Sequence, residues 1–105
     1  MRDWNGRSAV ITGGGSGVGK ALARRLGRDG ARILLCDIEQ AAIDATVAEL
    51  TGAGVDAIGA RLDVSDRDAV FAVADKAFDH FGTVDAVFNN AGVGGGGGMA
   101  PWAAP

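Results

Sequence analysis

The chain has no tyrosine, one cysteine and only two prolines among its 105 residues. A single Cys36 excludes an internal disulfide, and its place in the apolar run 33–36 predicts a buried, inert thiol, in keeping with a reducing compartment. The apolar runs are short and interrupted, so none is expected to span a bilayer. The first six residues lack the apolar stretch of a signal peptide, and we therefore expect a cytoplasmic protein.

An excess of positive charge is also missing. The formal net charge is −3 at pH 7, so we expect neither nucleic acid nor an anionic membrane as a partner. Hydrophobic residues make up 48% of the chain, which is enough for a packed core. The length is close to that of a common domain, so these features together predict at most one folded domain.

Glycine is abundant, with 18 residues, and many of them lie in two clusters. The first cluster, residues 13–19, follows the apolar run 9–11 and leads into apolar positions spaced like one face of a helix. The free N–H groups of a helix's first turn and its dipole favour an anion there. Because glycine has no Cβ atom, a pyrophosphate can approach the backbone closely. Segment 12–19 is therefore predicted to bind phosphate.

Hydrophobic periodicity and turn residues predict alternating strands and helices. Strands are expected at 8–11, 31–37, 55–62 and 84–88, and helices at about 17–29, 39–51 and 65–81. Ser65 and Asp68 resemble a capping box at the start of the last helix. This alternation predicts an α/β fold with a doubly wound parallel sheet, right-handed crossovers and ligand-binding loops at one edge of the sheet.

The second glycine cluster, residues 94–98, has a different meaning. The segment that follows it, 99–105, shows no periodicity and contains both prolines. We therefore predict a dinucleotide-binding domain over residues 1–93 and a disordered tail over 94–105.

Two common phosphate-binding patterns do not fit the first cluster. The dinucleotide fingerprint G-x-G-x-x-G matches nowhere between residues 13 and 19. The P-loop pattern G-x-x-x-x-G-K-[ST] fits Gly14, Gly19 and Lys20, but Ala21 stands where a hydroxyl should bind Mg²⁺. A nucleoside triphosphatase is therefore a disfavoured alternative.

A third pattern, T-G-x-x-x-G-x-G, is satisfied by Thr12, Gly13, Gly17 and Gly19. Together with the segment 89–92, Asn-Asn-Ala-Gly, it resembles the classical short-chain dehydrogenase/reductase family. The resemblance covers about residues 5–94. It implies a Rossmann-like fold with strand order 3-2-1-4, an NAD(P) cofactor and hydride transfer between nicotinamide and an alcohol or carbonyl carbon. Complete members continue beyond these elements, so the resemblance implies an N-terminal, NAD(P)-binding half with about four strands and three helices.

The resemblance also implies where the cofactor binds. The expected site comprises the glycine turn, the ends of the second and third strands and the Asn-Asn-Ala-Gly segment, with Asp63 and Val64 beside the adenine ring. Its expected members are Gly13, Ser16, Gly17, Val18, Gly19, Asp37, Ile38, Asp63, Val64, Asn90, Ala91 and Gly92. No metal site is expected. Asp63, Asn89 and Asn90 have a simpler alternative interpretation as turn residues at strand ends.

Asp37 at the end of the second strand predicts the choice of cofactor. A carboxylate can accept hydrogen bonds from both ribose hydroxyls and would repel a 2′-phosphate. It also stands about 20 residues after the glycines, where dinucleotide-binding folds place such an acidic residue. No arginine or lysine adjoins it. We therefore predict NAD rather than NADP, with capping of the helix 39–51 as the alternative role of Asp37.

Residues for the family's chemistry are missing from this sequence. The family uses a tyrosine, a lysine four residues later, a serine and an asparagine, all located after the Asn-Asn-Ala-Gly motif, whereas this chain has no tyrosine. We assign no catalytic residue and expect the chain to be inactive alone, with an alcohol or ketone substrate only in a full-length form. A non-catalytic dinucleotide-binding or scaffolding module is the alternative. The fourth strand would be a sheet edge open to self-association.

Overall fold

The computed structural model describes residues 3–15, 17–63 and 65–90. Its elements alternate between strands and helices from the first to the last. They are β1 (Ser8–Thr12), α1 (Gly17–Arg28), β2 (Arg32–Asp37), α2 (Gln40–Gly52), β3 (Ala57–Arg61), α3 (Arg67–Phe81) and β4 (Ala86–Asn89). The predicted order of elements is confirmed. Within these ranges, no helix has both the length and the apolar character needed to cross a membrane.

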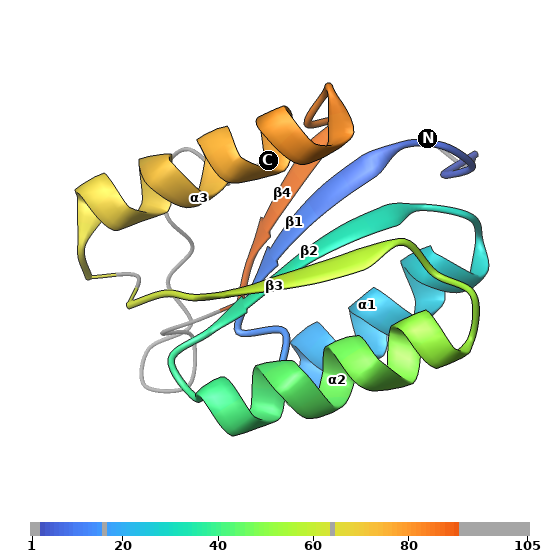
Figure 1. The fold of residues 1–105 in the computed structure, drawn as a ribbon, viewed down its shortest axis with the longest axis horizontal. Helices are drawn as coiled ribbons and strands as arrows, with labels where there is room; N and C mark the ends of the chain where they lie inside the picture. Colours follow the sequence, from blue (N-terminus) through green and yellow to red (C-terminus); the bar gives the residue numbers. More distant parts are fainter. Residues whose placement is uncertain (1–2, 16, 64, 91–105) are drawn as a thin grey trace.

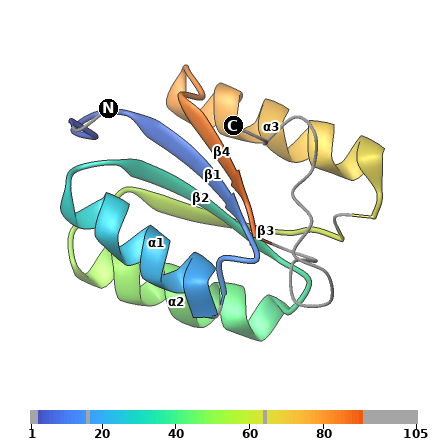
Figure 2. The same cartoon turned by 180° about the vertical axis from the view of Figure 1, so that it is seen from behind.

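The four strands form one parallel sheet in the order β3-β2-β1-β4. Helices α1 and α2 cover one face of this sheet, and α3 covers the other (Figure 1; Figure 2 gives the view from behind). The chain first moves from β1 outward to β3, and α3 then carries it back across the sheet to β4. The direction of winding therefore changes between β1 and β4, which is where open α/β sheets bind their ligands.

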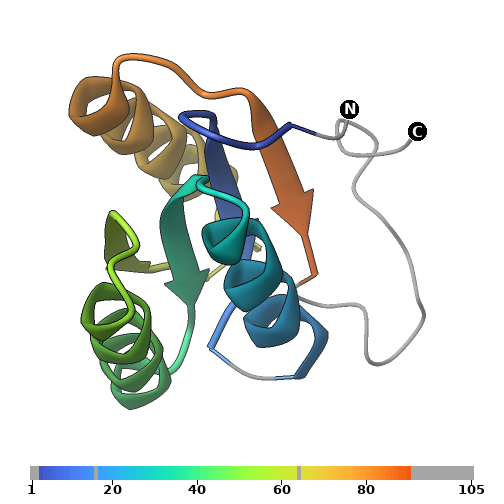
Figure 3. The ribbon, with the colours of Figure 1, turned by 90° about the vertical axis from the view of Figure 1, so that its right-hand side faces the viewer.

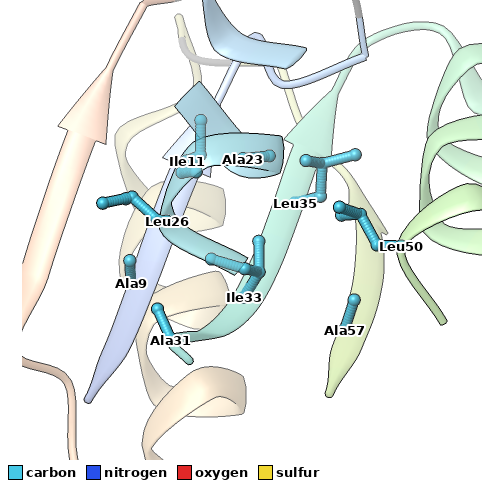
Figure 4. Packing of buried hydrophobic residues seen from close by; sticks show 9 residues of the cluster. All are labelled: Ala9, Ile11, Ala23, Leu26, Ala31, Ile33, Leu35, Leu50 and Ala57. Carbon is cyan, nitrogen blue, oxygen red and sulfur yellow. The ribbon is translucent and has the colours of Figure 1, made fainter. Parts of the chain in front are cut away.

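The core has two layers, one on each face of the sheet, and the side view shows the helices that cover these faces (Figure 3). On the α1–α2 side, the buried side chains of the strands, such as Ile11 and Leu35, pack against Leu26 of α1 and Leu50 of α2 (Figure 4). On the other side, a second set of buried side chains packs between the sheet and α3. Its buried members are Val10, Leu34, Cys36, Leu62, Val73, Ala77 and Phe81. Because both faces are covered, β1 is buried at every position, as expected for a parallel sheet.

Cys36 lies in this second layer with no exposed surface. Burial raises the pKa of its thiol to about 12, so the reactive thiolate is scarce at neutral pH. The prediction that Cys36 is buried is confirmed.

The start of α3 differs from the prediction. The residue that caps the helix is Asp66, whose carboxylate accepts a hydrogen bond from the Ala69 amide at 3.1 Å. Ser65 instead donates its hydroxyl to Asp63 at 2.7 Å. The capping box assigned to Ser65 is therefore wrong, because the preceding strand end competes for the same hydroxyl.

The other boundaries shift by a few residues. The third strand begins at Ala57 rather than at Val55, because the Val55 amide donates to the Leu50 carbonyl at 3.0 Å. Val55 thus belongs to the turn that ends α2. The predicted tail, residues 94–105, lies outside the described residues.

Candidate functional site

The turn between β1 and α1 requires glycine for two separate reasons. Gly13 and Gly17 have φ angles of 68° and 57°, in the left-handed region that glycine adopts without a steric cost. Gly14 is restricted by packing instead, since a Cβ atom there would lie 2.7 Å from Cγ of Leu35. The Gly14 amide donates to the Cys36 carbonyl at 2.9 Å. The turn is thereby attached to the end of β2.

Gly19 brings the first turn of α1 against this glycine turn. A Cβ atom on Gly19 would lie 2.9 Å from Cα of Gly14 and closer still to the Gly13 carbonyl. Only a residue without a side chain allows this approach. The free amides at the N-terminus of α1 consequently lie at the carboxyl edge of the sheet, an arrangement that favours a phosphate group.

Asp37 joins the glycine turn to the loop that follows β2. One carboxylate oxygen, Oδ2, accepts a hydrogen bond from the Gly15 amide at 3.1 Å, and Oδ1 accepts one from the Glu39 amide at 3.1 Å. Glu39 is the N-cap residue of α2 and makes no capping bond with its own side chain. Asp37 can therefore bond the backbone at the start of α2, as its alternative role requires, and still accept hydrogen bonds from a ligand, because a carboxylate has about four acceptor sites.

The end of β3 lies beside this loop. Asp63 accepts hydrogen bonds from the Ser65 hydroxyl at 2.7 Å and the Ser65 amide at 2.9 Å. The hydroxyl bond, followed by the amide bond, lowers the pKa of the Asp63 carboxyl. These bonds agree with the interpretation of Asp63 as a turn residue, and they leave acceptor capacity for a ligand.

One residue at this edge was missed by the sequence reasoning. Arg61, the last residue of β3, donates from Nε to the Ile38 carbonyl at 3.1 Å. Its register partner in the sheet is Asp37. No local sequence pattern signals this contact, because the two residues lie on different strands.

The end of β4 is held against the end of β1. The Thr12 hydroxyl donates to Oδ1 of Asn89 at 2.6 Å, and the Asn90 amide donates to the Thr12 carbonyl at 3.2 Å. Within the described part of the chain, the buried Nδ2 atom of Asn90 has no hydrogen-bond partner. A ligand with an acceptor oxygen at this edge would satisfy it.

The structure therefore brings most of the predicted residues to one edge of the sheet. Val18 lies in the first turn of α1 and is 73% exposed, and Ile38 follows Asp37 and is 49% exposed. Four predicted residues lie outside the described residues: Ser16, Val64, Ala91 and Gly92. Among the residues that the structure does describe, no group of three histidine, cysteine or acidic residues could hold a metal ion.

The geometry of Lys20 counts against a phosphate-loop triphosphatase. Its Nζ atom lies 3.9 Å from a carboxylate oxygen of Glu49 on α2. The same carboxylate pairs with Arg24. In a P-loop this lysine would contact the β- and γ-phosphates of the nucleotide, and here it pairs with a neighbouring helix.

Comparisons with known proteins agree with this geometry. The family model described as short chain dehydrogenase matches residues 7–103. A 1-deoxy-11-beta-hydroxypentalenate dehydrogenase of Streptomyces arenae is 42% identical over 99 residues, which are 94% of this chain and 35% of that protein.

Solved structures give the same result. A short chain dehydrogenase/reductase from Burkholderia phymatum in complex with NAD is 41% identical with a TM-score of 0.80, covering 83% of this chain and 31% of that one. A hydroxysteroid dehydrogenase from Escherichia coli is 36% identical with a TM-score of 0.82, covering 97% of this chain and 42% of that one. The chain spans about a third of the length of the curated relatives it matches.

Proposed function

Because this chain belongs to the short-chain dehydrogenase family, we propose that it is the NAD(H)-binding part of an oxidoreductase. In the full-length form, such an enzyme transfers a hydride between nicotinamide and an alcohol or carbonyl carbon. The observation that carries the proposal is the hydrogen bond of 3.1 Å from the Gly15 amide to the Asp37 carboxylate. It joins the expected ribose-binding residue to the expected pyrophosphate-binding turn. The NAD complex of the Burkholderia phymatum relative supports it.

The residues at the sheet edge fit a dinucleotide. Gly13, Gly17 and Gly19, with Ser16 and Val18, would hold the pyrophosphate at the N-terminus of α1 through backbone amides. A bare backbone is needed there, since a Cβ atom on Gly19 would overlap the Gly13 carbonyl. When bound, the nicotinamide ring supplies the hydride acceptor or donor.

The remaining site residues would bind the two nucleosides. Asp37 would accept hydrogen bonds from the adenosine ribose, while Ile38, Asp63 and Val64 would surround the adenine ring. The segment 90–92, Asn-Ala-Gly, would lie beside the second ribose, and the Asn90 Nδ2 donor, which has no partner among the described residues, would find an acceptor there.

The preference for NAD over NADP rests on charge. A 2′-phosphate would have to approach the Asp37 carboxylate, and two negative groups at contact distance repel each other. The Asp37 oxygens already accept amide bonds from Gly15 and Glu39. These bonds hold the carboxylate in place and oppose its rotation away from an added phosphate.

We further propose that the chain binds the cofactor without turning over a substrate. Its sequence contains no tyrosine, and tyrosine with a nearby lysine carries the proton transfer in the family. The same proposal includes three further points. The chain divides into a domain of residues 1–93 and a tail of 94–105, it associates with itself at the β4 edge, and its location is cytoplasmic. The edge position of β4 in the sheet supports self-association.

Calorimetric titration of the full chain with NAD, NADP and ATP·Mg²⁺ tests the proposal. We expect heat of binding with NAD, weaker binding with NADP and none with ATP·Mg²⁺. A folded sample that binds no NAD would contradict the proposal. Tighter binding of NADP than of NAD would contradict the role of Asp37 in selecting NAD. Binding of ATP·Mg²⁺ alone would favour the triphosphatase.

A further inference from the structure

Two hydrogen bonds join the end of β3 to the end of β2 and to the loop that follows it. The Leu62 amide donates to the Asp37 carbonyl at 2.9 Å, which continues the ladder of the sheet. The second bond comes from a side chain, since Nε of Arg61 donates to the Ile38 carbonyl at 3.1 Å. Two successive residues, Asp37 at the end of β2 and Ile38 at the start of the loop, are thus attached to the end of β3.

The bond from Arg61 links two parts of the proposed adenosine site. Ile38 lies on one side of it, with 49% of its surface exposed. Asp63 lies two residues beyond Arg61 on the other side, and the positive charge of Arg61 contributes to lowering the pKa of that carboxyl. The guanidinium therefore interacts with two of the residues that would surround the adenine ring, Ile38 and Asp63.

We propose that Arg61 is a positioning residue for the adenosine end of the dinucleotide. It holds the Ile38 carbonyl and so sets the separation between Ile38 and the end of β3. This inference rests on the proposed function. A loop that is already held in its binding conformation loses less conformational entropy when a ligand binds, and its affinity is correspondingly higher.

A hydrogen-bonding role and a charge role can be separated by two substitutions. Arg61→Met keeps most of the apolar stem and removes both the donor and the charge. Arg61→Gln also removes the charge, but its amide nitrogen stands at the same position along the side chain as Nε of arginine and can donate. If the bond to the Ile38 carbonyl is the cause, only the methionine variant loses affinity.

The experiment measures the dissociation constants of NAD, NADP and AMP for the full chain and its variants. Loss of this exposed hydrogen bond predicts about fivefold weaker binding of Arg61→Met to NAD and to AMP. Arg61→Gln should bind both within about twofold of the unmodified chain. Arg61→Ala serves as a second loss variant, because an exposed methionine can promote association.

The matched control is Arg25→Ala. Arg25 pairs with Asp29 at the opposite end of α1, so its removal changes the net charge in the same way without touching the site. We expect unchanged affinity in this variant and unchanged thermal unfolding in all variants, since Arg25 and Arg61 are both exposed.

The possible failures are distinct. If the unmodified chain binds no NAD, the proposed function fails and this inference fails with it. If it binds NAD and Arg61→Met binds equally well, only the positioning role is overturned. Equal losses in the methionine and glutamine variants would assign the effect to charge, and a loss confined to NADP would assign Arg61 to a 2′-phosphate; both results contradict the inference.

Discussion

The Asp37 carboxylate accepts a hydrogen bond from the Gly15 amide at 3.1 Å, although the two residues are 22 positions apart in the sequence. The residue proposed to bind the ribose thus also holds the turn proposed to bind the pyrophosphate. A Cβ atom on Gly15 would lie 2.9 Å from the same carboxylate oxygen, so the contact also requires glycine at position 15. Substitutions of Asp37 are expected to affect both functions.

Asp37→Asn and Asp37→Ala should separate these functions. Asparagine keeps one acceptor oxygen for a backbone amide and removes the negative charge, so the turn should remain while discrimination against NADP is lost. Alanine removes both the acceptor oxygen and the negative charge. We expect the ratio of NADP to NAD affinity to rise about tenfold in Asp37→Asn, and NAD affinity to fall by about tenfold or more in Asp37→Ala. Calorimetric titration measures both quantities.

Asp44→Asn is the control for this pair. Asp44 accepts a side-chain hydrogen bond from Gln40 on the exposed surface of α2, so the variant has the same change of charge away from the glycine turn. Its preference for NAD should be unaltered. An unchanged preference in Asp37→Asn as well would contradict discrimination by charge.

Gly19→Ala should destabilise the fold and abolish cofactor binding. The added methyl group would lie 2.9 Å from Cα of Gly14, and backbone atoms cannot move aside as a flexible side chain can. Overpacking of this kind costs about 1–3 kcal/mol of unfolding free energy. Urea denaturation measures that loss.

Gly52→Ala provides the matched control. Gly52 is the last residue of α2, and a Cβ atom there meets nothing within 4 Å. Alanine should therefore stabilise the protein by about 0.5–1 kcal/mol, because it lowers the conformational entropy of the unfolded chain. Equal stability of the two variants would contradict close packing at Gly19.

The Asp63 carboxyl should stabilise the protein at neutral pH and lose this contribution at acidic pH. The Ser65 hydroxyl and amide lower its pKa below the usual value of 3.8 in the folded protein. A lowered folded-state pKa stabilises the protein above the unfolded-state value, and this contribution is lost as the pH falls through the folded-state pKa. The stabilisation is thus fully present at neutral pH, and its change with pH is confined to values below about 4.

Ser65→Ala tests the cause of that shift. Without the hydroxyl donor, the pKa of Asp63 should rise toward 3.8, which carboxyl-detected NMR titration measures directly. Asp63→Asn should remove the corresponding part of the acid unfolding curve. If the titration of Asp63 were the same with and without the Ser65 hydroxyl, the assigned cause would be wrong.

Cys36 should report on folding. Burial raises its pKa to about 12, so a thiol reagent at mildly alkaline pH should modify the folded chain very slowly. In urea the exposed thiol has a pKa of about 8.5 and should react readily. Addition of NAD should slow the modification further if the cofactor stabilises the folded state. Rapid labelling of a folded sample would contradict the buried position of this residue.

The sequence determined the succession of elements and the position of the phosphate turn. Both depend on short-range features: apolar spacing within each segment and a glycine turn between an apolar run and a helix. The apolar strand β1 and the end of α3 depend on local features in the same way. Gly82 ends α3 in a left-handed conformation, and its amide donates to the Phe78 carbonyl. The strand order 3-2-1-4 followed from the family resemblance and is confirmed.

Contacts between distant segments were decided by the tertiary structure alone. The bond from Gly15 to Asp37 and the bond from Arg61 to Ile38 each depend on how two strand ends lie in space. A local pattern specifies which residues form a strand or a turn, but it contains no distance between one strand end and the next. That distance follows from packing both faces of the sheet, and it turns separate motifs into one candidate site.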